Sequence, residues 1–388
     1  MFEIFSKFFI LGCMSFGGPA AHIGYFRQAF VEKHQWLSDK DYGQFVALSQ
    51  FLPGPGSSQV GFSIGYHRAG LPGAIAAFLG FTLPSVFVML AIAYMSQSFS
   101  DNTFFEGMIH GLKLLAVIVV ADAVWGMFNN FCKNKTSVFL FAFTAMALLI
   151  IPSLYTQMCV LIFAAYIGKL YLSKEDNISS NTHAKIQLSW LPLVIFIGLL
   201  IGLPVLSHLN AHTQLFADFF QAGSLVFGGG HVVLPLLEGL VGEQLSQDAF
   251  LTAYATAQAV PGPMFTLATF LGFELLPSSP ILGALLATLA IFLPGFLLIL
   301  IVLKNWQALA SNASISGAMN GVNAAVVGLL LSALYQPVFQ SAVINNIDMA
   351  LVVLGIYLLK SLKLPILALV SLFSLLGVAS VYLSSGMS

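Results

Sequence analysis

The feature that most constrains the fold of this chain is a motif of helix-breaking residues that occurs twice. Phe16-Gly17-Gly18-Pro19 is followed by Pro53-Gly54-Pro55-Gly56, and in the second half Phe227-Gly228-Gly229-Gly230 is followed by Pro261-Gly262-Pro263. Both copies lie in apolar sequence, where a broken helix is costly unless the loosened backbone is buried in protein or lines a cavity. Paired breaks at matching positions of two halves are typical of membrane transporters and indicate where the substrate binds.

The composition predicts that the chain lies in a lipid bilayer. Of its 388 residues 58% are hydrophobic and 7% are charged, whereas soluble domains carry about 25% charged residues. The formal net charge of −1 offers no basic surface for nucleic acid. Cys13, Cys132 and Cys159 show no C-x-x-C spacing, so we expect no disulfide framework, no metal site and no cofactor. These properties predict an all-α integral membrane protein.

Each half reads as two interrupted segments followed by four continuous ones. Phe81-Thr82-Leu83-Pro84 matches Ile291-Phe292-Leu293-Pro294, and Ile109-His110-Gly111-Leu112 matches Met319-Asn320-Gly321-Val322. The chain therefore divides into a first repeat (1–172), a polar linker with one unpaired helix at 190–209 (together 173–213), and a second repeat (214–388). The expected segments are 5–24, 44–66, 72–95, 104–128, 136–151 and 153–172, then 216–235, 250–274, 281–303, 315–335, 347–361 and 364–383.

The unpaired helix and the positive charges predict that the two repeats have inverted topology. An even number of crossings followed by one further helix turns the second repeat upside down. If the interrupted segments are re-entrant hairpins and the N-terminus is cytoplasmic, every basic residue except Lys113 faces the cytoplasm, as the positive-inside rule expects. If those segments crossed fully, Arg27, Lys33 and Lys40 would be external. We therefore favour re-entrant segments.

The Pro-Gly-Pro breaks are the first candidate substrate site. Proline ends a helix, and the half-helix that follows presents free N–H groups and the positive end of its dipole, which can bind an anion without a full charge. The alternative is a structural kink with satisfied hydroxyl groups. The candidate residues are Gln50, Gly54, Gly56, Ser57 and Ser58 in the first repeat and Gln258, Gly262 and Thr266 in the second.

The Phe-Gly-Gly breaks supply further candidates. Their glycines allow a close approach of the backbone, either to a ligand or to a neighbouring helix. His22 and His231 follow the two breaks, two positions out of register, and each could bind an anion or relay a proton. A hydrogen-bonded packing histidine is the alternative for both. The glycine candidates are Gly17, Gly18, Gly228 and Gly229.

Lys113 is the sharpest single candidate, because a charge at membrane depth is expensive and by default functional. Its repeat counterpart is the neutral Asn323, and snorkelling of the lysine to the membrane interface is the alternative. Asp122 projects from roughly the opposite face of the same helix, as a candidate for proton transfer or ion pairing. Glu274, at the end of a half-helix, is a candidate for the same roles or a residue of the membrane edge.

Taken together, these motifs resemble the chromate ion transporter family. The segments 16–23, 48–55 and 80–84 are similar to the family's N-terminal signature, and 224–231 with 257–263 are similar to its C-terminal counterpart. The resemblance covers nearly the whole chain. It implies a two-repeat protein of the bacterial inner (plasma) membrane that moves chromate. The related sulfate ion is a near-isosteric tetrahedral dianion, and the motifs do not choose between the two.

We therefore expect a transporter that exports chromate or a related oxyanion from the cytoplasm. Half-helix N-termini of both repeats would hold the anion near the midplane, with Lys113 adding positive charge. The alternative is an oxyanion channel or a sulfate/anion exchanger that uses the same site, and uniport, proton exchange and anion exchange stay open. An enzyme is disfavoured because no clustered catalytic set is present. The expected partners are the oxyanion and the bilayer, and assembly as a homodimer is left open.

Overall fold

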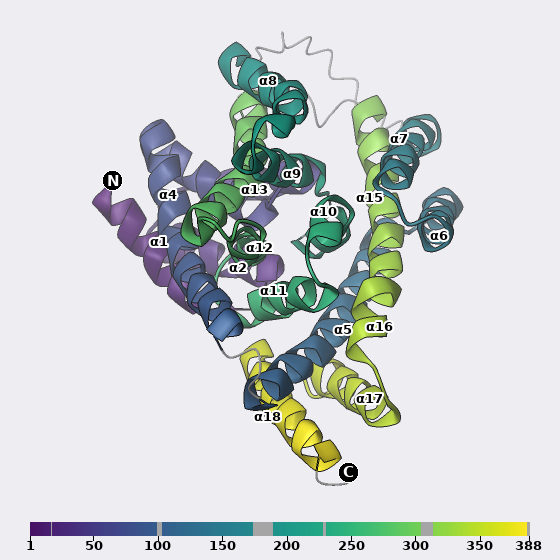
Figure 1. Cartoon of the computed structure of the whole chain (residues 1–388). Helices are drawn as coiled ribbons and strands as arrows, with labels where there is room; N and C mark the ends of the chain where they lie inside the picture. The colour runs from purple at the N-terminus through teal and green to yellow at the C-terminus, as the bar shows by residue number, and fades with distance from the viewer. Residues whose placement is uncertain (17, 99–102, 174–188, 228–229, 304–312, 386–388) are drawn as a thin grey trace.

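The computed structural model describes residues 1–16, 18–98, 103–173, 189–227, 230–303 and 313–385, and these residues form helices and no strands. Figure 1 shows the path of the chain. The first repeat contains α1 (Phe2–Met14), α2 (Gly18–Phe26), the π-helix η1 (Arg27–Lys33), α3 (Asp39–Phe51), α4 (Gly56–Ser98), α5 (Thr103–Phe131), α6 (Lys135–Ile150) and α7 (Leu154–Tyr171). The unpaired helix is α8 (Trp190–Leu206), followed by the short 3-10 turn η2 (Ser207–Leu209).

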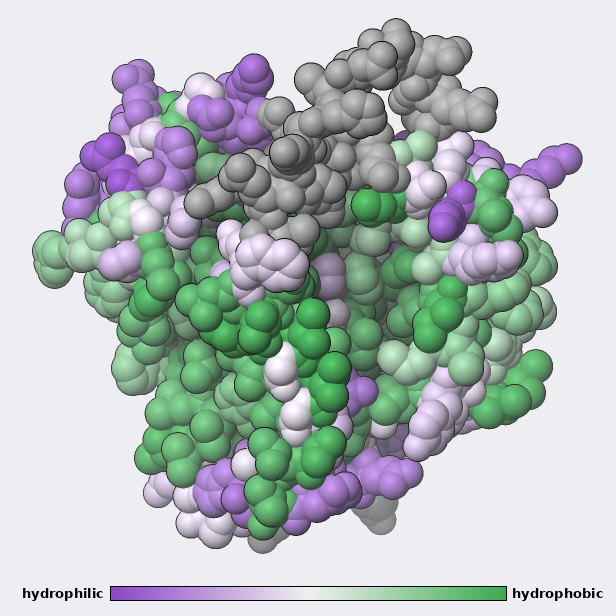
Figure 2. Space-filling model, turned by 90° about the horizontal axis from the view of Figure 1, so that it is seen from above, coloured by the Kyte–Doolittle hydropathy of each residue, from purple (hydrophilic) through white to green (hydrophobic). Residues whose placement is uncertain are grey.

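The second repeat repeats this order. It contains α9 (Ala211–Leu225), η3 (Gly230–Val232), α10 (Val233–Val241), η4 (Gly242–Gln244), α11 (Gln247–Ala259), η5 (Met264–Thr266), α12 (Leu267–Leu275), α13 (Pro280–Val302), α15 (Ala313–Ala333), η6 (Leu334–Phe339), α16 (Gln340–Ala342), α17 (Asn346–Lys360) and α18 (Ile366–Ser385). Six helices in the described part of the chain are long and apolar enough to cross a membrane. Figure 2 shows a broad apolar face with polar residues gathered along two opposite edges. The all-α membrane fold is therefore confirmed.

The interrupted segments of the first repeat are re-entrant hairpins, as predicted. In the first hairpin the ring of Phe8 in α1 lies 4.6 Å from that of Phe30 in η1, so the two arms run side by side. In the second, the guanidinium of Arg68 lies 5.3 Å from the ring centre of Trp36, which precedes α3. Both ends of the second hairpin therefore lie together. Its first arm, α3, has 13 residues and a length of about 20 Å, less than the ~30 Å of a bilayer core.

A tight turn separates each second hairpin from the spanning helix that follows. Within α4 the helix breaks at Ala69 and Gly70, where Gly70 has a φ of +63°. A Cβ on Gly65 would lie 2.4 Å from the carbonyl oxygen of Gly73, so the two helices touch backbone to backbone. A Cβ on Gly272 in α12 would lie 2.4 Å from the carbonyl oxygen of Gly283 in α13. The two repeats thus share even this close contact.

Contacts between the long helices establish the inversion. His110 and Asp122 of α5 pair with Asp348 and Lys360 of α17, so these two helices run parallel. A short turn reverses the chain between the α15–η6–α16 helix and α17. Helix α15 therefore runs antiparallel to its counterpart α5, and the second repeat is inverted relative to the first. The interpretation of inverted repeats is confirmed.

The last helix of each repeat packs against the other repeat. Helix α5 packs against α18, and α15 packs against α7. Both contacts use a Gly-x-x-x-Gly face, which lets helix backbones approach closely in a membrane. A Cβ on Gly111 would lie 1.8 Å from the carbonyl oxygen of Phe373, and one on Gly321 would lie 2.1 Å from that of Ala164. Figure 1 shows α5 and α15 beside these exchanged partners.

The hairpins and the inversion make a testable prediction about sidedness. We expect a cytoplasmic N-terminus and an external η4 turn, because the basic residues then lie in the cytoplasm. In a variant whose three cysteines are replaced by serine, a membrane-impermeant thiol reagent added outside should label Gln244→Cys and leave Lys40→Cys unlabelled. The reverse pattern in intact cells, with both sites labelled after lysis, would contradict this orientation.

Candidate functional site

The tips of the re-entrant hairpins meet at the centre of the molecule and are bonded across the two repeats. The amide of Gly54 donates a hydrogen bond of 2.7 Å to the carbonyl oxygen of Val226, and the amide of Gly262 donates one of 2.9 Å to that of Ser15. Val226 and Ser15 are the equivalent ends of α9 and α1. Each Pro-Gly-Pro break is therefore tied to the first hairpin of the other repeat.

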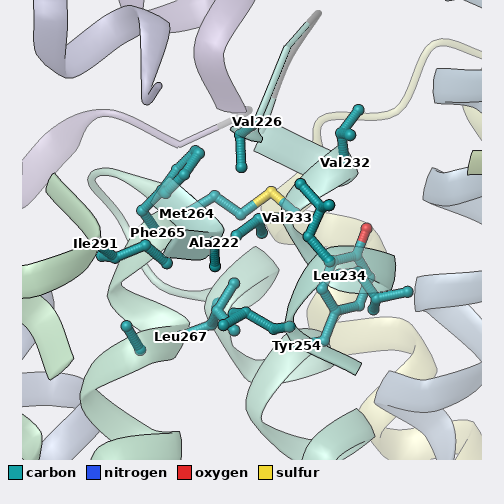
Figure 3. Packing of buried hydrophobic residues seen from close by; sticks show 14 of the residues in the cluster. Ala222, Val226, Val232, Val233, Leu234, Tyr254, Met264, Phe265, Leu267 and Ile291 are labelled. Carbon is teal, nitrogen blue, oxygen red and sulfur yellow. The ribbon is translucent and has the colours of Figure 1, made fainter. Parts of the chain in front are cut away.

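Glycine is required at both junctions by the backbone itself. Gly54 has a φ of +126° and Gly262 a φ of +102°, a region that L-residues with a Cβ rarely adopt. A Cβ on Gly262 would also lie 2.1 Å from the hydroxyl of Ser85. Figure 3 shows the apolar side of this junction, where Met264, just after the second break, packs beside Val226 and Val232 of the neighbouring hairpin.

His22 joins the two hairpin tips of the first repeat. Its Nδ1 lies 3.2 Å from the hydroxyl of Ser57, and its Nε2 lies 3.2 Å from the carbonyl oxygen of Ser15. The side chain is fully buried. His22 therefore has the contacts of a packing histidine. His231 has another environment: it contacts the hydroxyl of Tyr254 at 2.9 Å and also lines a cavity.

Several buried polar groups without hydrogen-bond partners among the described residues lie around the breaks. Because the Gly54 and Gly262 amides bond to carbonyl groups, the free donors lie in the half-helices that follow, where the first N–H groups of α4, at Gly56, Ser57 and Ser58, have no intrahelical acceptor. Thr266 bonds back to the carbonyl of Pro263. Buried side-chain atoms near the breaks that have no hydrogen-bond partner among the described residues are Ser15 Oγ, Ser58 Oγ, Gln59 Oε1, Ser85 Oγ and Gln258 Nε2. Buried polar groups are normally paired, so such a cluster indicates a place for a polar ligand.

A cavity of about 570 Å³ reaches these tips, and we call it the tip cavity. It is bounded by the Phe-Gly-Gly break of the first repeat, the Pro-Gly-Pro break of the second repeat, α5, and the turn between α17 and α18. Of the predicted site residues it brings together Gly18, Asp122, His231, Gln258 and Gly262. Asp122 is paired with Lys360 of α17, and ion pairing was one of the two roles considered for it.

A second cavity of about 820 Å³ lies against the equivalent part of α15 in the other repeat, and we call it the acidic cavity because Glu238 and Glu243 line it. Val119, Asp122 and Ala123 line the tip cavity, and the residues 210 positions later, Leu329, Ser332 and Ala333, line the acidic cavity. The turn between α6 and α7 replaces that between α17 and α18. Because the repeats are inverted, the two cavities lie toward opposite sides of the membrane.

Other predicted residues lie away from the tip cavity. Lys113 is 8% exposed and its Nζ lies 2.6 Å from Oδ1 of Asp248, at the start of α11. This pair lies near the end of α5 where His110 pairs with Asp348. Its predicted role in attracting an anion stays a prediction. Gln50 is exposed at the end of α3, and Glu274 is half-buried in the last turn of α12. Gly17, Gly228 and Gly229 lie outside the described residues.

An exposed ion pair joins the bases of the first two hairpins. Arg27 donates to both carboxylate oxygens of Asp39, at 3.0 and 2.9 Å, and so joins the bases of the first two hairpins. This hydrogen bonding lowers the pKa of Asp39 from its usual value.

In the part of the chain that the structure describes, no group of three or more His, Cys, Asp or Glu side chains could hold a metal ion.

Inverted repeats whose broken hairpins meet beside a cavity define a membrane transporter. The chain belongs to the chromate transporter family, whose profile matches residues 2–169 and 213–379. It is 28% identical to an uncharacterised transporter of Methanocaldococcus jannaschii (97% of this chain, 93% of that protein). It is 27% identical to the chromate transport protein of Cupriavidus metallidurans (97% and 92%) and to a probable chromate transport protein of Synechococcus elongatus (85% and 83%). No solved structure matches it.

Proposed function

We propose that this protein exports chromate, or a related tetrahedral oxyanion such as sulfate, from the cytoplasm of a bacterial cell across its inner membrane. The observation that carries the proposal is the convergence of broken hairpins from both repeats on a set of buried, unused polar groups. A relative that matches 97% of the chain is named a chromate transport protein. The oxyanion would bind near the midplane, between the start of α4 and the second break.

The chemistry of the tips suits a dianion with four oxygens. Hydroxyl groups of Ser58 and Ser85, the amide of Gln258 and the first N–H groups of α4 are hydrogen-bond donors that do not need a fixed charge. Neutral donors bind an anion while leaving it free to depart, which a transporter requires. Chromate and sulfate have similar shape and charge, so discrimination between them would rest on the spacing of these donors.

The paired cavities favour a carrier over a channel. The tip cavity reaches the hairpin tips and the acidic cavity does not. The tips are hydrogen-bonded across the repeats, at Gly54 with Val226 and at Gly262 with Ser15. An inverted pair of repeats can exchange conformations, so that the site opens first to one cavity and then to the other. On the sidedness expected above, the tip cavity faces the cytoplasm and the acidic cavity faces outward. The structure would then represent the state that loads substrate from inside.

The membrane potential by itself can drive this export. Moving one elementary charge through 100 mV is worth ~2.3 kcal/mol, so an inside-negative potential expels a dianion without a coupled ion. We expect purified protein in liposomes to take up labelled chromate or sulfate in a direction set by the imposed potential, with pH varied independently. A channel would instead give single-channel currents far above carrier turnover. Absence of transport of both anions at every potential and pH would contradict the proposal.

A further inference from the structure

An ion pair stands at the tip cavity, where an anion would enter. Asp122 of α5 lines the cavity, and its carboxylate is paired with the ammonium group of Lys360 at the end of α17. The neighbouring Leu359 also lines the cavity. The two side chains of the pair are 37% and 48% exposed, so the lysine is free to change partners. A carboxylate on this wall would repel a dianion if the lysine did not neutralise it.

The other repeat shows that the fold does not need this ion pair. The position equivalent to Asp122 is Ser332. The matching N-caps Asn134 and Asn345 are 211 residues apart, so the position equivalent to Lys360 is Leu149. Both residues line the acidic cavity. Matching positions of the two repeats therefore carry two charges in one case and none in the other. A structural role alone would not account for charges on one side only.

We propose that Lys360 is a substrate-binding residue, which releases Asp122 and binds the oxyanion as it enters the tip cavity. This inference rests on the proposed function. An ammonium group makes a charge-assisted hydrogen bond to an oxyanion, about twice as strong as a neutral one. Asp122 holds the lysine beside the cavity while no anion is present. It also competes with the anion, so that binding stays weak enough for the anion to move on toward the hairpin tips.

The acidic cavity offers the opposite electrostatic environment. Among the described residues that line it there is no lysine or arginine, and Glu238 and Glu243 are present. A dianion would therefore bind more tightly from the side of Lys360 than from the side of the two glutamates. On the proposed orientation this difference favours loading in the cytoplasm and release outside.

The test measures the equilibrium binding of labelled chromate to purified full-length protein, together with its uptake into liposomes. We expect Lys360→Gln to weaken binding by about tenfold, because the anion loses a charge-assisted hydrogen bond, and Asp122→Asn to strengthen it. Lys363→Gln is the matched control, because Lys363 is exposed in the same turn and loses the same charge. Lys360→Arg should keep most of the affinity.

The double variant separates substrate binding from mere neutralisation. If Lys360 binds the oxyanion, Asp122→Asn with Lys360→Gln should bind chromate more weakly than the wild type. Wild-type affinity in the double variant, or a Lys360→Gln protein that matches Lys363→Gln, would overturn the inference. If Lys360→Gln does not fold, the Asp122→Asn variant decides, and unchanged or weaker binding overturns the inference. A wild type that neither binds nor transports oxyanion would refute the proposed function and this inference together.

Discussion

Replacing Gly262 by leucine should abolish oxyanion transport. The backbone there has a φ of +102°, and the hydroxyl of Ser85 lies 2.1 Å from where the new Cβ would be. A left-handed backbone costs a non-glycine residue about 1–2 kcal/mol, so the leucine variant would leave this conformation. The backbone must also move away from Ser85. Either movement breaks the hydrogen bond to Ser15 that joins the repeats. Uptake of labelled chromate by liposomes measures the effect.

Gly54→Leu should have the same effect, because its φ of +126° and its bond to Val226 are the equivalent features of the first repeat. Gly43→Leu is the control: Gly43 lies in the α3 arm of the same hairpin, and a Cβ there meets no atom within 4 Å. This control should transport normally. Folded Gly54→Leu and Gly262→Leu proteins with wild-type transport would show that the junctions do not matter for function.

Much of this fold is predictable because its determinants are local. Proline and glycine fix where the hairpins break, and the excess of basic residues on one side fixes which breaks re-enter. The inversion then follows from counting crossings. The exchange of α7 and α18 between the repeats is not predictable in this way. A Gly-x-x-x-Gly face predicts that another helix packs closely against it, but it does not predict which helix.

In the candidate site, too, the residues set by local motifs are predictable and the contacts between distant helices are not. Gly18, Gln258 and Gly262 come to the tip cavity because the breaks that contain them are its walls. Ser85 is not among the residues predicted from the sequence. Its place directly after Pro84, in a motif that the repeats share, is the signal that could have indicated it. From the sequence, Lys360 is only one of the basic residues that indicate orientation, because its distance to Asp122 depends on how α5 and α17 pack. Pairings between distant helices are where sequence reasoning ends.

His22 and His231 illustrate why equivalent motifs need not have equivalent roles. Their two-position offset relative to the breaks places one beside Ser57, at the meeting point of two hairpins, and the other in the wall of the tip cavity. A pattern that is nearly repeated therefore carries information in its departures. The exact repeats, such as the paired Gly-Pro breaks, report the shared architecture. The departures, including Asp122 against Ser332, indicate where the two sides of the membrane are treated differently.

Gly111→Val should destabilise the protein severely, because this glycine lies at the closest contact between α5 and α18. A Cβ at Gly111 would lie 1.8 Å from the carbonyl oxygen of Phe373, which belongs to the backbone of α18 and cannot move aside as a side chain would. Overpacking typically costs about 1–3 kcal/mol, and occasionally more. Since α18 belongs to the other repeat, the substitution should separate the two repeats and leave the hairpins within each repeat intact.

The thermal unfolding of detergent-solubilised protein measures this effect, and the same helix supplies a control. A Cβ at Gly126 meets no atom within 4 Å, so Gly126→Val should unfold close to the wild-type temperature. Gly321→Val, at the equivalent contact of α15 with Ala164, should behave like Gly111→Val, because the inverted repeats bury both glycines in the same way. If Gly111→Val and Gly126→Val unfold together, the exchanged helix contact does not hold the repeats together. If Gly111→Val is destabilised and Gly321→Val is not, the two repeats differ in stability despite their common design.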